Sequence, residues 1–220
     1  MLFYSQLLEI VALSLEVSLV AVMLAALIGI PLGALLAIGR FPGRTALIVL
    51  VNALMGLPPV VVGLGLYLLL SRSGPLGILQ LLYTPTAMII AQTILVTPII
   101  ASFSHQIFAD LHREYDEMLR AMRASRWQTI LTLIREARHA LITAILAGLG
   151  RALSEIGAVM IVGGNINHAT RVMTTAIALE TSKGNLRLAV SLGLILLALS
   201  FAINLALHFL RSRLERAAHA

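Results

Sequence analysis

The sequence predicts an all-α integral membrane protein, a bundle of five transmembrane helices. Of its 220 residues, 59% are hydrophobic and 12% are charged, whereas soluble domains average roughly 45–50% and 25%. The mean hydropathy is +0.96, and five stretches of low charge are long enough to cross a bilayer. These observations exclude a soluble enzyme and a disordered tail, and the absence of cysteine excludes a disulfide scaffold.

The five spans are expected at about 10–39, 45–71, 84–104, 139–163 and 188–210. Each holds the roughly 20 mainly apolar residues that a helix needs to cross the hydrocarbon core. Two further segments lie outside the spans, a charged insert at about 105–138 and a segment at about 164–187. Because no repeat or linker divides the chain, we expect residues 1–220 to form one domain.

Positive charge predicts the orientation of this bundle. Eleven arginines follow the first span, lie in the insert or follow the fifth span, whereas four Lys and Arg residues lie in the other loops. Cytoplasmic loops of membrane proteins are rich in Lys and Arg. The N-terminus is therefore expected outside, and the insert and the C-terminus in the cytoplasm. This topology explains the net charge of +6 without a nucleic-acid partner.

Proline and one charged pair stand out within the spans. Pro58 and Pro59 remove two backbone donors and are expected to kink or break the second span, with like effects from Pro31, Pro85 and Pro98 in other spans. Such a break either lines a pathway or is a common feature of membrane helices without functional meaning. Both interpretations of Pro58 remain open.

Arg151 is expected near the middle of the bilayer, about 18 Å along the fourth span from His139 at 1.5 Å per residue. Glu155 follows four residues later on the same face, so the two side chains can neutralise each other. An ion pair that fixes helix packing is one interpretation. The other is a gate or pathway for an anion, with candidate residues Pro58, Arg151, Ser154 and Glu155.

The insert holds eleven of the 26 charged residues and two short apolar helical faces. Ser125 and Gln128 have the spacing of a capping box, which predicts a second helix after a turn at Ala124–Ser125. Such a helix pair docks on a partner or lies along the lipid headgroups. Membrane anchors on both sides argue against a DNA-binding helix-turn-helix.

Residues 117–127 resemble the "EAA" loop of the membrane subunits of ABC importers. Strings at 56–65, 84–88, 97–99, 150–160 and 173–181 are similar to the oxyanion branch of that family, and above all to its tungstate importers. Three departures are visible: Arg123 replaces the glycine of the motif, Leu119 replaces its second alanine, and Arg135–Glu136 replaces the closing Leu-Pro.

The resemblance implies a type I importer permease in the plasma membrane of a prokaryote, working by alternating access. It implies a homodimer, two copies of a cytoplasmic ABC ATPase that bind ATP and Mg, and an extracytoplasmic binding protein that delivers an oxyanion. Tungstate is the first expectation, followed by molybdate and sulfate. The residues expected to couple to the ATPase are Glu117, Arg120, Ala121, Ala124, Ser125 and Trp127.

We expect no cofactor, metal site or enzymatic activity in this chain itself. A phosphate-binding loop needs Gly-Lys before Ser or Thr, but the single lysine, Lys183, follows Ser182 and precedes Gly184. Two other classes remain as alternatives. An ATP-independent channel or transporter would need a pathway dense in Asp, Glu or His, whereas Glu155 alone lies deep in a span. A membrane scaffold would use the insert to recruit a protein without transport.

Overall fold

A computed structural model describes residues 2–218, with side chains except those of residues 2–6, 120, 126, 127, 207, 208 and 210–218. The described chain is helical throughout. Its elements are α1 (Leu2–Ile38), α2 (Arg44–Leu54), α3 (Pro59–Leu70), the 3₁₀ helix η1 (Gly77–Leu79), α4 (Pro85–Ala121), α5 (Arg126–Leu153), α6 (Gly157–Gly163), α7 (Met173–Ser182) and α8 (Leu186–Ala218).

Three of these helices are long and apolar enough to cross a membrane: α1 over Leu7–Ile38, α4 over Pro85–Leu119 and α8 over Leu186–Ala206. Two further candidates are bent pairs. The axes of α2 and α3 differ by 99°, and those of α5 and α6 by 58°. The described residues therefore hold three straight candidates, or up to five spans if each bent pair counts as one.

The break in the second predicted span falls at proline, as expected. Pro58 is the N-cap residue of α3 and Pro59 its first residue. The other prolines do not break a helix: Pro31 and Pro98 lie inside α1 and α4, and Pro85 begins α4. One missing hydrogen bond does not end a helix of 37 residues whose remaining ladder and packing hold it, and the first helical position needs no N–H donor.

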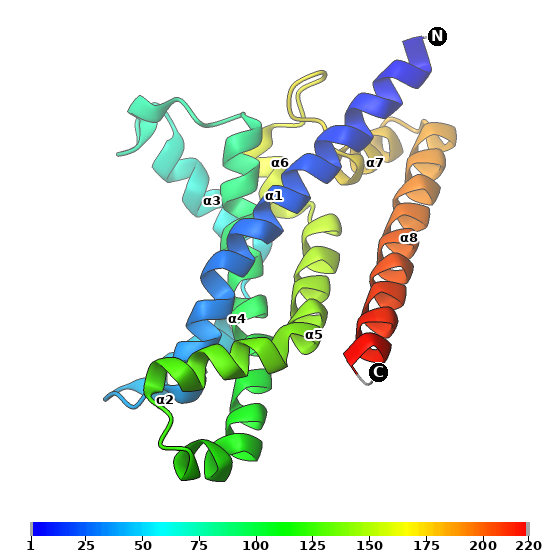
Figure 1. The fold of residues 1–220 in the computed structure, drawn as a ribbon. Coiled ribbons are helices and arrows are strands. Elements are labelled where there is room, and N and C mark those ends of the chain that lie inside the picture. Colours follow the sequence, from blue (N-terminus) through cyan, green and yellow to red (C-terminus); the bar gives the residue numbers. More distant parts are fainter. Residues whose placement is uncertain (1, 219–220) are drawn as a thin grey trace.

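Helices α1 and α4 form the centre of the bundle and cross in the middle of the molecule (Figure 1). They approach closely because small residues line the contact: a Cβ atom on Gly33 would lie 2.6 Å from the Cβ of Ser104. On this pair pack α3 and α6 near one end, through Val17, Met88 and Val159. Near the other end packs α5, through Phe108 and Leu133.

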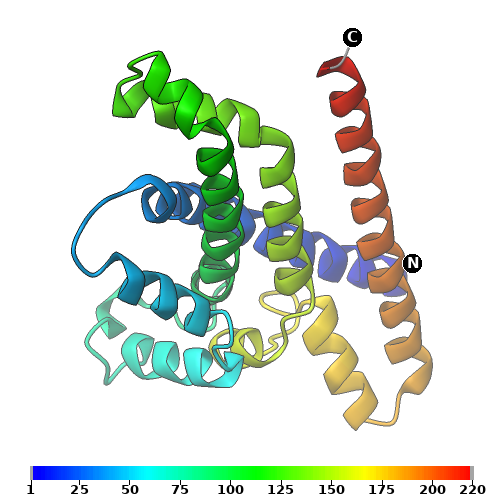
Figure 2. The ribbon, with the colours of Figure 1, turned by 90° about the horizontal axis from the view of Figure 1, so that it is seen from below.

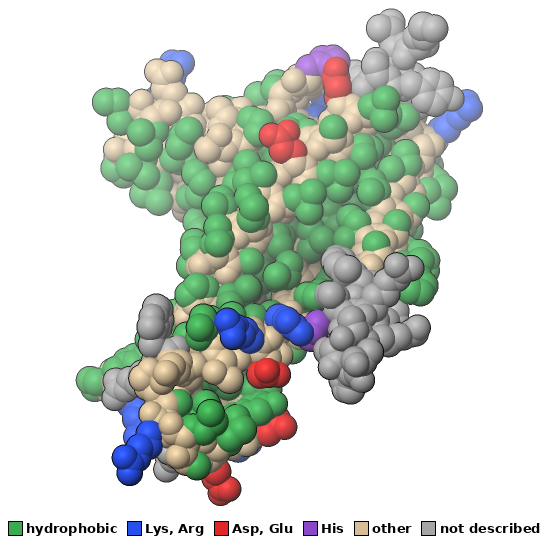
Figure 3. Space-filling model, viewed as in Figure 1, with side chains coloured by type: hydrophobic (Ala, Val, Ile, Leu, Met, Phe, Trp, Pro, Cys, Tyr) green, Lys and Arg blue, Asp and Glu red, His purple; other side chains and the backbone are tan. Residues whose placement is uncertain are grey.

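The predicted insert is continuous with the spans that flank it. Helix α4 runs on to Ala121, and α5 starts at Arg126 and continues to Leu153. The first part of α5 runs crosswise below the bundle before the helix turns upward beside α4 (Figures 1 and 2). The residues between α4 and α5, 122–125, are called the insert turn below. Hydrophobic side chains cover the middle of the visible face and charged ones gather toward its ends, most of them around the insert (Figure 3).

Candidate functional sites: an exposed helical turn and two helix breaks

The insert turn is closed by the capping box that the sequence predicts. The Oγ of Ser125 accepts a hydrogen bond from the backbone N–H of Gln128 at 3.3 Å, and the Gln128 side chain accepts one from the Ser125 N–H at 2.7 Å. Two of the free donors at the start of α5 are thus satisfied. This arrangement fixes where α5 begins and so the position of the turn.

Arg123 adopts a backbone conformation that side chains rarely take. Its φ angle is 51°, in the left-handed region, which costs an L-residue roughly 1–2 kcal/mol. The conformation reverses the chain after α4, and the N–H of Ala124 donates to the carbonyl of Leu119 at 3.0 Å. Glycine takes this conformation without the steric penalty. Arg123 therefore adopts the backbone conformation that a glycine would adopt at this position.

The candidate coupling residues lie at this end of the molecule. Glu117 and Ala121 are exposed on the last turns of α4, Ser125 is exposed, and Ala124 is half-buried. The side chains of Arg120 and Trp127 lie outside the described part of the chain. Around them are exposed apolar side chains, including Met118, Met122 and Leu131. The turn therefore presents a mixed apolar and charged surface.

The two helix breaks lie between α2 and α3, at Pro58, and between α5 and α6. The α5–α6 break separates Arg151, in the last turn of α5, from Glu155, which precedes α6. Their ion pair is present: the Arg151 Nη1 lies 3.0 Å from the Glu155 Oε2. The Glu155 side chain is 2% exposed and that of Arg151 30%. Ser154, the C-cap residue of α5, is exposed and donates its hydroxyl to the Arg151 carbonyl at 3.0 Å.

Side chains from the break itself, from α7 and from α4 bond to backbone groups around this break. The Oε1 of Glu155 accepts from the Ala158 N–H at 3.0 Å and so caps α6. The carbonyl of Glu155 accepts from the Thr174 hydroxyl of α7 at 2.8 Å, and the carbonyl of Ala152 accepts from the Gln92 amide of α4 at 3.1 Å. Unpaired backbone groups are costly in a membrane, so these contacts stabilise the break.

The two breaks meet in space, because α3 and α6 begin side by side. A Cβ atom on Gly157 would lie 3.1 Å from the Val60 Cγ2, and one on Gly63 would lie 2.9 Å from the Cα of Ala158. Pro58 is thereby brought near the Arg151–Glu155 break. Gln92 and Thr174, which hold that break, were not singled out from the sequence, because nothing in their local spacing links them to it.

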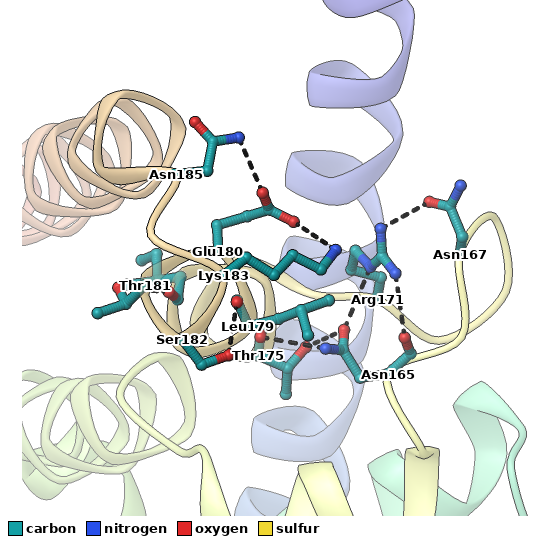
Figure 4. Close-up of polar contacts among 11 residues, drawn as sticks. Asn165, Asn167, Arg171, Thr175, Leu179, Glu180, Thr181, Ser182, Lys183 and Asn185 are labelled. Carbon is teal, nitrogen blue, oxygen red and sulfur yellow. Dashed lines mark hydrogen bonds and ion pairs between the residues drawn. The ribbon is translucent and has the colours of Figure 1, made fainter.

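A polar network organises the segment between α6 and α8 (Figure 4). The Arg171 guanidinium donates to the Asn165 Oδ1 at 3.3 Å and to the Asn167 Oδ1 at 3.1 Å. At the end of α7, Glu180 accepts from Lys183 at 3.1 Å and from Asn185 at 2.9 Å. These two hydrogen bonds favour the charged carboxylate and hold the pKa of Glu180 below its ordinary value.

A helix-turn-helix that projects from a bundle of apolar helices, with a charged break inside the bundle, is the architecture of a membrane protein. Residues 29–218 match the model of the binding-protein-dependent transport system inner membrane component. The chain belongs to this family and is a permease subunit of an ABC importer.

Similar proteins cover nearly the whole chain. The tungstate uptake system permease protein TupB of Peptoclostridium acidaminophilum is 43% identical over 95% of this chain and 92% of its own length. A probable anion ABC transporter permease of Haloferax volcanii is 43% identical over 90% and 88%. A putative molybdenum transport system permease of Bacillus subtilis is 30% identical over 87% and 88%.

Proposed function

We propose that this permease moves tungstate into the cytoplasm of a prokaryote. The observation that carries this substrate is the 43% identity to a tungstate uptake permease over 95% of the chain. It works with two copies of a separate ABC ATPase, which binds ATP and Mg, and with an extracytoplasmic protein that delivers the anion. Two copies of the chain form the pathway at their interface, because a bundle of so few helices is too small to enclose it.

The proposed topology has five spans, with each bent helix pair counted as one, an external N-terminus and a cytoplasmic C-terminus. The start of α1 and the end of α8 lie at opposite ends of the molecule, as an odd number of spans requires (Figure 1). Positive charge supports the same orientation. The single domain then comprises the predicted spans, the cytoplasmic insert at 105–138 and the outer segment at 164–187.

The ATPase docks on the insert turn through Glu117, Arg120, Ala121, Ala124, Ser125 and Trp127. Supporting this assignment, the turn is exposed, capped and continuous with two long helices. Movement of the turn on ATP binding is carried along α5 to the break at Ser154. The bundle then alternates between outward-facing and inward-facing states, a two-state switch biased by ATP.

The gate comprises Pro58, Arg151, Ser154 and Glu155. The contact between α3 and α6 supports this grouping, since it joins the two breaks. The N-terminus of α3 has no side-chain cap, and its partial positive charge favours an anion, whereas the N-terminus of α6 is capped by Glu155. Because Arg151 is partly exposed whereas Glu155 is buried, the positive member of the pair is the one that can face the pathway.

The test is ATP hydrolysis by the reconstituted complex, with its binding protein loaded in turn with tungstate, molybdate and sulfate. We expect stimulation by tungstate, lost in Glu117→Gln and retained in Glu114→Gln, which removes another exposed carboxylate one turn earlier on α4. Equal stimulation by molybdate would broaden the substrate to both oxyanions. No stimulation by any of the three would reject the substrate, and loss of activity in both variants would reject the coupling site.

A further inference from the structure

A groove of about 650 Å³ opens between the end of α1 and the insert. Its walls are mainly apolar and come from the last turns of α1, the crosswise part of α5, the insert turn and α4, with Ile30, Leu35 and Ile134 among them. Leu35 is 55% exposed and Ile134 is 40% exposed. The groove runs along α1 for about 12 Å from Ile30 to Ile38, at 1.5 Å per residue.

A second cavity, of about 350 Å³, continues this groove beyond the end of the helix. The two share a wall that includes Ile38, Arg40, His112 and Asp116. Three arginines line the second cavity, Arg40, Arg44 and Arg113, whereas Asp116 is the one carboxylate on its wall. The combined space is therefore apolar at one end and predominantly cationic at the other.

The arginines differ in how strongly the protein itself engages them. Arg44 donates to the carbonyls of Leu36 and Ala37 at 2.5 and 3.1 Å and so caps the end of α1. Arg113 lies 3.7 Å from Asp110, with both side chains more than three-quarters exposed, where such a pair is weak. Arg40 is exposed. Two guanidinium groups are thus available for an anion at the mouth of the groove.

The change from apolar to cationic walls coincides with the end of the candidate span, since the apolar stretch of α1 ends at Ile38 and Arg40 follows. We infer that the joint groove binds an anionic phospholipid, with an acyl chain along α1 and the headgroup phosphate between Arg40 and Arg113. Basic pockets between helices at a cytoplasmic membrane surface bind such headgroups, and arginine forms strong bonds to phosphate oxygens. The inference uses the cytoplasmic placement of the insert from the proposed topology, but not the transported substrate.

The test is native mass spectrometry of the full-length chain in detergent micelles, titrated with phosphatidylglycerol or phosphatidylcholine of identical acyl chains. We expect the protein to retain phosphatidylglycerol preferentially. The double variant Arg40→Ala/Arg113→Ala should weaken this binding by about 30-fold, since each arginine near the headgroups contributes on the order of 1 kcal/mol. Arg135→Ala removes an exposed charge of the insert outside both cavities and should leave binding unchanged.

Three results would overturn the inference: equal retention of both lipids, equal losses in the double variant and in Arg135→Ala, or competition by inorganic phosphate at the concentration of the lipid. The last would identify a site for a small oxyanion. A lower dimer fraction in the double variant, without any lipid dependence, would assign the groove to a second copy of the chain. Because the readout is binding to the isolated chain, these results stand whether or not tungstate stimulates ATP hydrolysis.

Discussion

Arg151 and Glu155 lie on opposite sides of a helix break, and a 3.0 Å ion pair joins them across it. The pair is asymmetric, because the Glu155 side chain is 2% exposed and that of Arg151 is 30% exposed. Removing the arginine leaves the buried Glu155 carboxylate without its ion-pair partner. Removing both charges leaves no buried charge that needs a partner. This difference separates the structural role of the pair from a role in transport.

Arg151→Ala should therefore destabilise the protein by about 3 kcal/mol, the usual cost of an uncompensated buried charge. Arg151→Ala/Glu155→Gln should recover at least half of this loss, since the amide oxygen of the introduced glutamine can still accept from the Ala158 N–H. Chemical unfolding of the chain in micelles measures both values. Equal losses in the two variants would contradict the argument. If the double variant folds but does not transport, the charged pair acts in transport as well as in folding.

Arg123→Gly should stabilise the insert turn by about 0.5–1 kcal/mol. Glycine removes the steric cost of a φ angle of 51°, and its greater freedom in the unfolded chain offsets part of the gain. Arg123→Ala is the matched control, because alanine also carries a Cβ and should show no such gain. Unfolding midpoints of the three proteins provide the test, and equal midpoints for glycine and alanine would contradict it.

Replacing Gly164 or Gly184 by alanine should reduce the stability of the protein by unequal amounts. Both have positive φ angles, 69° and 76°, but a Cβ on Gly164 would lie 2.7 Å from the Tyr83 ring, whereas one on Gly184 meets nothing within 4 Å. Gly184→Ala should cost about 1 kcal/mol of backbone strain. Gly164→Ala should cost at least about 1 kcal/mol more, because the ring must move. Equal losses of thermal stability would show that the ring yields freely.

The turn between α7 and α8 should lose stability at acid pH because Glu180 becomes protonated there. Its pKa is lowered in the folded protein by hydrogen bonds from Lys183 and Asn185, so folding favours the deprotonated carboxylate. This contribution is complete above the ordinary pKa of a glutamate and disappears as the pH falls through the lowered value. The backbone N–H of Asn185 donates to the backbone carbonyl of Glu180 at 2.9 Å. Its hydrogen exchange should become faster in acid as the α7–α8 turn opens.

The matched variant for this pH effect is Glu180→Gln. A glutamine side chain can still accept from Asn185 but carries no charge, so protection of the turn should no longer depend on pH in the acid range, after correction for intrinsic exchange. A variant that retains the dependence of the parent protein would assign the effect to another carboxylate.

Local patterns in the sequence predicted the features that are held by neighbouring residues. The capping box of Ser125 and Gln128 and the break at Pro58 depend on contacts within a few positions, and both are present. The pairing of Arg151 with Glu155 was predicted as well, but on a continuous helix. The break between them carries no proline and depends on Thr174, 19 residues away, and Gln92, 60 residues from the carbonyl that it caps. Contacts at such separations leave no local pattern.

A single proline did not predict where a helix of this protein ends. Pro31 and Pro98 have the same local effect on the backbone as Pro58, but they lie inside continuous helices. Burial does not separate the two outcomes, because Pro98 is buried whereas Pro31 is exposed, as Pro58 is. Pro58 differs in that it adjoins a second proline, so two successive residues lack an N–H donor.

Helix α8 has the least lateral support of the three long helices. Of its most apolar window, 11% is buried, compared with 39% in α1 and 61% in α4. Its buried residue Leu192, which packs with Met173 and Ala176 of α7, lies near the beginning of α8. Its apolar stretch of 21 residues is about 32 Å long, close to the hydrocarbon thickness of a bilayer. In a thinner membrane α8 is consequently the helix that tilts first, while the crossed pair of α1 and α4 keeps its angle.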